Sequence, residues 1–483
     1  MSKLIKAKNS LIIKNPERFY EQQLAALEWL DGFMKSNKTE ATLEGYAGTG
    51  KTYILKYFLS NICKVSACPT APTHKALRVV EKLLHRKGKT IQSLHGLRPN
   101  LDIANFDISN PQFDPKGQTY MRNYGLVIID EASMITDDMY ELNYKRAEEF
   151  NIKILYVGDP LQLPPVTKGN KESMSKSKVF SVENKFTLTQ IVRQEKDNPL
   201  LELFPLLRND VINGTTTFLS HIFKQRSNKF NGGGYEILNE NSFNKILKDY
   251  FTIEKINENM DSARVISYTN MSVKINNNYI RRLLTNSKDI LCEDDVLTSY
   301  STIVDEFNQP IIINSEDYYI EHIRPYTNEN QIKTFAVNLR SMYDNRQSLT
   351  LQIVDHTHES FKTYYKILNY LHSEAINSKA SNRAKNWIKY FKFKDSMLTM
   401  ISFRLNERNN NRIVSKDIDY GYSLTTHKSQ GSTFKNVLID LEDILYWKTH
   451  RGVLKSRPNS NNIINRLIYV AVSRATDKAI FKL

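Results

Sequence analysis

The feature that most constrains this chain is the stretch 45–52, which reads Gly-Tyr-Ala-Gly-Thr-Gly-Lys-Thr. Residues 41–43 before it suit a short buried strand, and residues 53–59 after it suit a helix. Glycines at a strand-to-helix turn let backbone N–H groups surround a phosphate, and the helix N-terminus adds positive partial charge. Lys51 would reach the β- and γ-phosphates, and the Thr52 hydroxyl would sit on Mg²⁺. The sequence therefore predicts a nucleotide-binding protein.

A second and a third nucleotide element lie downstream of this loop. Residues 126–129 form a fully apolar run, typical of a central parallel strand, and end in Asp130 and Glu131. There Asp130 can hold Mg²⁺ through water, and Glu131 can polarise the attacking water. Another apolar run, 154–157, leads into a proline-rich turn that contains Gln162. Such a stiff turn fixes a polar side chain, so Gln162 is the candidate sensor of the γ-phosphate, with a rigid loop without chemistry as the alternative.

The bulk composition narrows the class of protein. A chain of 483 residues exceeds one hydrophobic core, so roughly two to four domains are expected. No apolar run is long enough to span a bilayer, and the three cysteines lack zinc or redox spacing, which predicts a cytoplasmic protein without disulfides. Lysine and arginine exceed aspartate and glutamate by 67 to 52, giving a net charge of +15. This excess favours a polyanion binder, although a merely basic soluble protein would show it too.

Four further motifs follow in order along the chain. They read Thr-Ala-Pro-Thr-His-Lys-Ala at 70–76, Leu-Thr-Gln-Ile-Val-Arg-Gln at 188–194, Thr-His-Lys-Ser-Gln-Gly within 422–434, and Arg-Leu-Ile-Tyr-Val-Ala-Val-Ser-Arg-Ala at 466–475. With the three nucleotide elements, they resemble the superfamily-1 helicases, in the RecD-like 5′→3′ branch that contains the phage Dda-type helicases. The resemblance covers nearly the whole chain.

The resemblance implies an ATP-dependent DNA helicase that uses Mg²⁺, moves 5′→3′ on single-stranded DNA and unwinds duplex. Its implied catalytic residues are Lys51, Glu131, Gln162 and two arginine fingers, Arg193 and Arg474. The metal would be held at Thr52 and Asp130, and Gln23 would read the adenine. The full set of nucleotide contacts that it implies is Gln23, Gly45, Tyr46, Ala47, Gly48, Thr49, Gly50, Lys51, Thr52, Asp130, Glu131, Gln162, Arg193, Gly431 and Arg474.

The resemblance also implies a track for single-stranded DNA across both cores. The contacts it suggests are Pro72, Thr73, His74, Thr90, Gln92, Phe106, Phe113, Thr269, Asn270, Thr426 and His427. One departure concerns Gln92, where members of this branch often carry a histidine. Glutamine can still hydrogen-bond a phosphate or a sugar. Phe106 and Phe113 would belong to a small hairpin, the pin that splits the duplex, with a plain surface loop as the alternative.

Strand-loop-helix segments recur on both sides of residue 200, which predicts an α/β chain with two parallel-sheet cores that the family would make RecA-like. ATP would then lie between the cores. The predicted boundaries are 1–92 with 122–198 for the first core, 93–121 for the pin, 199–286 with 419–483 for the second core, and 287–418 for a second insertion, a small β-barrel with a helical hairpin at about 356–394.

The prediction of a helical hairpin depends on two amphipathic patterns in the sequence. Apolar residues recur three and four positions apart at Phe361, Tyr364, Leu368 and Leu371, and again at Ala384, Trp387, Ile388 and Phe391. This spacing predicts two helices. Their aromatic residues are expected to form core rather than a base-stacking surface. Two polar, basic stretches, 406–412 and 451–462, are expected to be mobile linkers.

Two rival functions stay open at this point. A 3′→5′ helicase of the UvrD-like branch disagrees with the Leu-Pro-Pro of 163–165 and with the His-Lys-Ser-Gln of 427–430. A nucleic-acid-stimulated ATPase that remodels or strips protein–DNA complexes would use the same motor. RNA is a lesser alternative as the track. The expected partners are single-stranded DNA and duplex junctions, with single-strand-binding or replication proteins as candidates, and the chain is expected to be a monomer without membrane contact.

Overall fold

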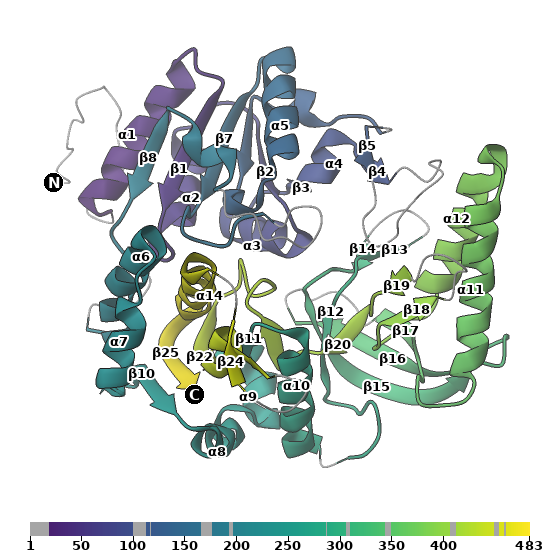
Figure 1. The fold of residues 1–483 in the computed structure, drawn as a ribbon. Coiled ribbons are helices and arrows are strands. Elements are labelled where there is room, and N and C mark those ends of the chain that lie inside the picture. The colour runs from purple at the N-terminus through teal and green to yellow at the C-terminus, as the bar shows by residue number, and fades with distance from the viewer. Residues whose placement is uncertain are drawn as a thin grey trace.

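The computed structural model describes residues 19–99, 113–115, 117–165, 176–192, 197–285, 287–305, 310–342, 349–405, 412–448, 454–457 and 460–483. Two sheets, each flanked by helices, face one another across the middle of the molecule, and a third, β-rich region with a long helical pair lies beside the second sheet (Figure 1). Among the described helices, none has both the length and the apolarity needed to cross a bilayer.

Six parallel strands form the first sheet, in the order β3-β2-β6-β7-β1-β8. All four side chains of the central strand β6 are fully buried, as its uninterrupted apolar run predicts. The strands are β1 (Glu40–Gly45), β2 (Ala67–Ala71), β3 (Lys89–Thr90), β6 (Leu126–Ile129), β7 (Lys153–Gly158) and β8 (Lys185–Leu188). The helices are α1 (Glu21–Lys35), α2 (Lys51–Asn61), α3 (His74–Leu84), α4 (Ile91–His95) and α5 (Asp137–Phe150).

The second sheet has the order β21-β11-β22-β25-β10-β9, and every neighbouring pair is parallel except β10 with β9. The strands are β9 (Ser227–Phe230), β10 (Gly233–Leu238), β11 (Ala263–Ser267), β21 (Ser423–Thr425), β22 (Phe434–Asp440) and β25 (Ala475–Lys482). The helices are α6 (Leu203–Asn213), α7 (Thr217–Lys224), α8 (Glu240–Tyr250), α9 (Ile253–Glu258), α10 (Asn270–Thr285), α13 (Leu441–Leu445) and α14 (Asn461–Ser473). Two α/β cores on mainly parallel sheets, as predicted, are therefore present.

The third region is built on an antiparallel sheet in the order β17-β16-β15-β12-β20. Its strands are β12 (Val296–Ser299), β15 (Asp317–Thr327), β16 (Lys333–Ser341), β17 (Leu349–Val354) and β20 (Ile418–Tyr420). Short pairs join β13 (Ile303–Val304) to β14 (Pro310–Ile312), and β18 (Phe403–Leu405) to β19 (Arg412–Val414). The interpretation of this region as a barrel insertion stays a prediction.

Two long helices, α11 (Phe361–Asn377) and α12 (Ala380–Asp395), lie where the spacing of apolar residues predicts them and pack against each other. Tyr364, Leu368 and Trp387 are buried in a shared core, so the expectation of packing rather than base stacking is confirmed for them. Ile388, which the spacing places on the apolar face of the second helix, is instead 59% exposed, while Tyr390 is buried.

The remaining segments are short. β4 (Arg98–Pro99) pairs with β5 (Phe113–Asp114) at the place of the predicted pin, but the tip that would carry Phe106 lies outside the described residues. The stretch 451–462 is only partly a linker: β24 (Leu454–Ser456) pairs with β23 (Tyr446–Lys448), and Ser460 caps α14. Single 3₁₀ turns lie at Met121–Asn123, Ala132–Met134, Lys178–Ser181, Pro199–Glu202 and Met260–Ser262.

Candidate active site

The glycine-rich loop joins β1 to α2 at the carboxyl edge of the first sheet. Gly48 and Gly50 have φ values of 81° and 82°, in the left-handed region that glycine adopts without strain. A Cβ added to Gly50 would lie 2.6 Å from Gln23 Nε2, so the end of the Gln23 side chain would have to move. Lys51, the first residue of α2, donates from Nζ to the carbonyl oxygens of Gly45 at 2.6 Å and Tyr46 at 3.1 Å. The loop thus places backbone N–H groups, a helix N-terminus and an ammonium together, as an anion site requires.

Asp130 and Glu131 follow β6 and point into the same cavity. Glu131 has a φ of 51°, which is uncommon for a residue with a side chain and typical of functional sites. Burial, and after it the neighbouring charge of Glu131, raises the pKa of Asp130 to about 7. The charge of Lys51 opposes this shift only in part. Such a buried carboxylate is suited to a divalent cation, because the cation supplies compensating charge.

The cavity has a volume of about 290 Å³ and is lined from both sheets. Most of the predicted nucleotide contacts line it, namely Ala47, Gly48, Thr49, Gly50, Lys51, Thr52, Asp130, Glu131, Gln162, Gly431 and Arg474. The donor set fits magnesium and a triphosphate: a hydroxyl at Thr52, a carboxylate at Asp130 and several backbone N–H groups. Mg²⁺ commonly takes only one or two carboxylates and completes its shell with water and phosphate oxygens, so a larger acidic cluster is not needed.

The proline-rich turn after β7 is held from two sides. Asp159 Oδ2 accepts from the backbone N–H of Ala47 at 2.9 Å and from the Tyr469 hydroxyl at 2.6 Å. Arg466 Nη1 donates to the carbonyl oxygens of Pro160 at 2.9 Å and Gln162 at 2.6 Å. Tyr469 and Arg466 both lie on α14 of the second core, so this helix is tied directly to the phosphate loop and to the glutamine turn (Figure 1).

Gln162 itself is buried, and its Oε1 has no hydrogen-bond partner among the described residues. An unpaired buried acceptor is costly, so a ligand or water at the cavity side would relieve that cost. This is the behaviour expected of a side chain that orients a water. Sequence reasoning found Gln162 but missed Asp159, Arg466 and Tyr469, because their connection spans about 310 residues of sequence.

Arg474 approaches from the second core. The side chain is nearly fully buried, and its guanidinium donates to the carbonyl oxygens of Val470 and Ser432, each at 3.2 Å, and to Ser473 Oγ at 2.9 Å. Burial lowers its pKa, and the charge of Glu131 partly opposes that shift. Gly431 also comes close, since a Cβ added there would lie 3.7 Å from Glu131 Oε1. The second core therefore faces the candidate base directly.

Four predicted nucleotide contacts do not line the cavity or cannot be assessed. Gly45 and Tyr46 are not among the lining residues, and their carbonyl oxygens accept from Lys51. Gln23 lies in the first turn of α1, where Oε1 accepts from the Tyr20 N–H at 3.2 Å and Nε2 donates to the Thr49 carbonyl at 3.4 Å. Its amide thus supports the phosphate loop and does not line the cavity. Arg193 lies outside the described residues, while the preceding Val192 lines the cavity and donates its N–H to the Gly48 carbonyl at 2.7 Å.

The predicted DNA contacts of the first core lie at the starts of two helices. Thr73 caps α3 by accepting from the Ala76 N–H at 3.2 Å, and Thr90 caps α4 by accepting from Ser93 at 3.3 Å. Pro72, His74 and Gln92 are half-buried beside them. Burial lowers the pKa of His74, with the charge of Arg78 adding to the effect. Phe113, on β5, is exposed.

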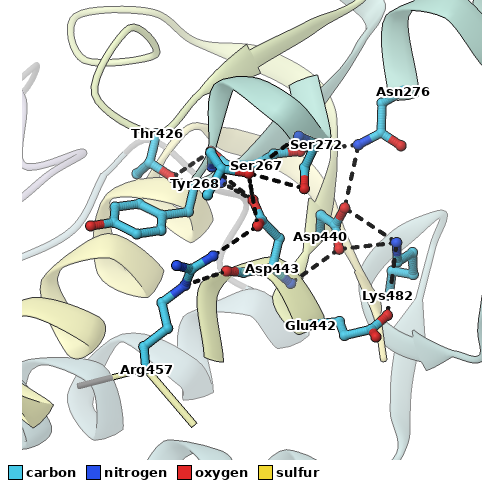
Figure 2. Close-up of polar contacts among 11 residues, drawn as sticks. Ser267, Tyr268, Ser272, Asn276, Thr426, Asp440, Glu442, Asp443, Arg457 and Lys482 are labelled. Carbon is cyan, nitrogen blue, oxygen red and sulfur yellow. Dashed lines mark hydrogen bonds and ion pairs between the residues drawn. The ribbon is translucent and has the colours of Figure 1, made fainter. Parts of the chain in front are cut away.

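On the second core, the turn at Tyr268 and Thr269 is organised by Asp443 (Figure 2). Its Oδ2 accepts from the backbone N–H groups of Tyr268 at 2.8 Å and Thr269 at 2.7 Å, and Arg457 donates to its Oδ1 at 3.0 Å. The Arg457 guanidinium also lies 4.7 Å from the centre of the Tyr268 ring. Asn270, which begins α10, is exposed at the end of this turn. No motif in the sequence indicates the roles of Asp443 and Arg457.

Thr426 and His427 have different surroundings: Thr426 is buried and supports the turn, whereas His427 is partly exposed. Thr426 is fully buried and donates its hydroxyl to the Ser267 carbonyl at 3.2 Å, so its side chain supports the turn, which corrects the expectation of a side-chain contact. His427 is half-buried, with its ring 6.3 Å from that of Tyr268. The adjacent Lys428 is anchored by the Ser299 carbonyl at 2.9 Å, and burial lowers its pKa to about 7.

Comparison with known proteins agrees with this geometry. A family described as AAA domain matches residues 19–221. The uncharacterised protein R530 of Acanthamoeba polyphaga mimivirus is 24% identical and is matched over 95% of this chain and 98% of its own length. The ATP-dependent DNA helicase dda of Enterobacteria phage T4 is 24% identical, with 53% of this chain matching 56% of dda.

Two further proteins are similar over a smaller share of this chain or at a lower sequence identity. The human ATP-dependent DNA helicase PIF1 is 28% identical, with 34% of this chain matching 26% of that protein. The structure of a Bacteroides Pif1 helicase with ADP-AlF3 and single-stranded DNA aligns with 94% of this chain and 91% of its own, at 17% identity and a TM-score of 0.49. The order of the motifs, the site that they form and the matches to dda, PIF1 and a RecD2 helicase support a superfamily-1 helicase of the Pif1/RecD-like kind, related to Dda.

Proposed function

We propose that this chain is an ATP- and Mg²⁺-dependent helicase that moves 5′→3′ along single-stranded DNA and unwinds duplex DNA. The observation that carries the proposal is that one cavity is lined by Lys51, Glu131 and Gln162 from the first core and by Gly431 and Arg474 from the second. Because hydrolysis in such a cavity changes what holds the two cores together, it can drive their opening and closing.

The side chains have separate tasks in this proposal. Gln162 Oε1 and Glu131 would orient the attacking water, and the Glu131 carboxylate would accept its proton. Lys51 and Arg474 would stabilise the negative charge that develops on the transferring phosphoryl group, with Arg193 as a further candidate. Thr52 and Asp130 would hold Mg²⁺, which when bound neutralises charge on the phosphate oxygens. A role for Gln23 in reading adenine stays part of the proposal.

Movement would follow from the contacts between the cores. Tyr469 and Arg466 connect α14 to the phosphate loop and the glutamine turn, so a change at the nucleotide can shift α14 relative to the first sheet. A strand held by His74 on one core and by Thr269, Asn270 and His427 on the other would be pulled as the distance between these contacts changes. The likeness to dda and PIF1, both named ATP-dependent DNA helicases, supports the helicase activity, and the 5′→3′ direction is inferred from the family resemblance of the motifs.

A strand-displacement assay run beside an ATPase assay tests the proposal. The expected result is ATPase activity that rises on adding single-stranded DNA, together with ATP-dependent displacement of one strand of a tailed duplex. Lys51→Ala, the negative control, should lose both activities. ATPase stimulation without any displacement would overturn the unwinding function and favour a remodelling ATPase.

A further inference from the structure

A large groove runs beside α10, outside the nucleotide cavity. It has a volume of about 1090 Å³ and is bounded on one side by the helix face that carries Met271, Lys274, Asn278 and Arg282. The other side is formed by residues 287–290, 400–402 and 416–420 of the third region and its connections. The groove therefore lies between the second core and the third region.

The groove is basic, and three of its cations are unpaired. Lys274, Arg282 and Lys288 are exposed and have no hydrogen-bond or ion-pair partner among the described residues. Arg281 and Lys416 also line the groove, but each is paired with a carboxylate, Asp295 and Asp419 respectively. Counting Asp289 and Asp419 against the five cations leaves a net charge of +3 on the lining. The positive charge of the three exposed cations can therefore attract a polyanion.

Uncharged polar groups accompany the cations. Asn270, Asn278, Ser287 and Ser402 line the groove. His356 lies there too, and its buried Nδ1 has no hydrogen-bond partner among the described residues. Amides, hydroxyls and a ring nitrogen can bind phosphate and sugar oxygens without reading a base sequence.

The position of the groove connects it to the candidate DNA surface. Asn270 is one of its lining residues and directly follows the turn at Tyr268 that Asp443 holds (Figure 2). Two buried asparagines fix α10 in place: Asn276 donates to Ser267 Oγ on β11 of the second sheet at 3.0 Å, and Asn277 donates to the carbonyl of Tyr420 on β20 of the third region at 2.7 Å. The face of α10 that carries the cations is thus held toward the groove, which shares Asn270 with the predicted track.

We propose that this groove binds the phosphodiester backbone of single-stranded nucleic acid that continues past Asn270, beyond the segment gripped by the two cores. The proposal rests on the proposed function, because the strand must already lie on the core surface. The cations are spread along the groove, and a strand contacting them in succession would release counterions from several phosphates. The groove shares Asn270 with the predicted single-strand track, so a single strand is the occupant.

The test compares strand length and salt dependence in two triple variants. The first carries Lys274→Ala, Arg282→Ala and Lys288→Ala. The matched control carries Lys224→Ala, Lys245→Ala and Lys248→Ala, which removes the same charge from exposed positions on α7 and α8. Affinity is measured by fluorescence anisotropy with oligothymidylates of about 8 and about 20 nucleotides, a range that separates a core site from an extended one.

The wild type and the control should bind the longer strand more tightly than the shorter one. The groove variant should bind both strands with similar affinity. Its slope of log K against log salt for the long strand should fall by about 2, at about 0.7 per lost phosphate contact. Binding of the short strand, and the ATPase activity it stimulates, should match the wild type, which also shows that the variant is folded.

Three results would overturn the proposal: an unchanged slope in the groove variant, an equal loss in the control variant, or an equal loss for short and long strands. An unchanged slope together with lost binding of poly-glutamate would assign the groove to an acidic polypeptide instead. Failure of the wild type to bind the short strand would instead contradict the proposed helicase function, so the two failures can be distinguished.

Discussion

The nucleotide cavity and the basic groove beside α10 differ in how the protein holds their charged side chains. In the cavity, Lys51, Asp159 and Arg474 are each held by two or more hydrogen bonds from the protein. In the groove, Lys274, Arg282 and Lys288 are exposed and without partners among the described residues. Catalysis needs groups that are oriented before the reaction, whereas binding to a moving strand needs charge that can change partners. The comparison predicts that the two sites fail differently when mutated.

The largest effect should come from Glu131→Gln. An amide cannot accept the proton of the attacking water, so turnover of ATP should fall by about 10²–10⁴-fold. Binding of single-stranded DNA should persist, because neither the core track nor the groove uses this side chain. The measurements are steady-state ATPase and oligonucleotide affinity on the same preparation. A loss below about threefold in turnover would mean that another residue is the base.

A smaller effect is expected from Tyr469→Phe, which removes the hydroxyl that donates to Asp159 beside the phosphate loop. Loss of one hydrogen bond to a charged group, worth about 1.5 kcal/mol or more, should lower kcat for ATP by about tenfold. Because Tyr469 lies on the second core, strand displacement per ATP hydrolysed should fall as well.

Tyr235→Phe is the matched control for that variant. It removes a hydroxyl that donates to Glu202 at the same 2.6 Å, away from the cavity. If both variants lowered kcat equally, the connection between α14 and Asp159 would be structural only. If Tyr469→Phe changed kcat but left displacement per ATP intact, the coupling role of α14 would be contradicted.

The smallest effect concerns stability, at a buried polar site away from both regions. Arg146 can only donate, so His95 Nδ1 accepts from it at 3.0 Å and Nε2 carries the proton given to Asn143 Oδ1 at 2.6 Å. Burial lowers the pKa of His95 to about 4, from 6.5. A depressed folded-state pKa gives stability that is present above pH 6.5 and is lost as pH falls toward 4.

Urea unfolding at pH 7 and pH 5 checks this expectation. The free energy of unfolding of the wild type should drop between these pH values by on the order of 1–2 kcal/mol more than that of His95→Gln. His322→Gln, which removes an exposed imidazole, is the control and should follow the wild type. Parallel behaviour of the wild type and His95→Gln would contradict the assigned neutral state.

The same contrast explains what could be predicted from sequence. The phosphate loop, the acidic pair and Gln162 are local motifs, because phosphate chemistry requires fixed residue types at fixed spacing. Two parallel-sheet cores followed from the apolar runs before those motifs. The pairing of Asp159 with Tyr469 could not be predicted, since nothing in either segment indicates the other across about 310 residues.

The groove and the supporting side chains could not be predicted from the sequence for a related reason. Lys274, Lys288 and Lys416 become neighbours only when α10 packs beside the third region, and exposed lysines carry no pattern of their own. The expected surface role of the Thr426 side chain failed because a turn residue can face inward to a backbone carbonyl as readily as outward. The sequence also does not indicate that Gln23, which the resemblance assigns to the adenine, donates to the Thr49 carbonyl of the phosphate loop.

The most direct test of the central claim is unwinding of duplexes that differ only in the polarity of their single-stranded tail. With ATP and Mg²⁺, a duplex with a 5′ tail should be separated, while one with only a 3′ tail should stay intact, and Lys51→Ala should separate neither. The expected direction follows from kinship with the Pif1/RecD-like group, since the cavity chemistry alone is shared by motors of both directions. Efficient separation of the 3′-tailed duplex with the 5′-tailed duplex inert would contradict the proposed 5′→3′ helicase.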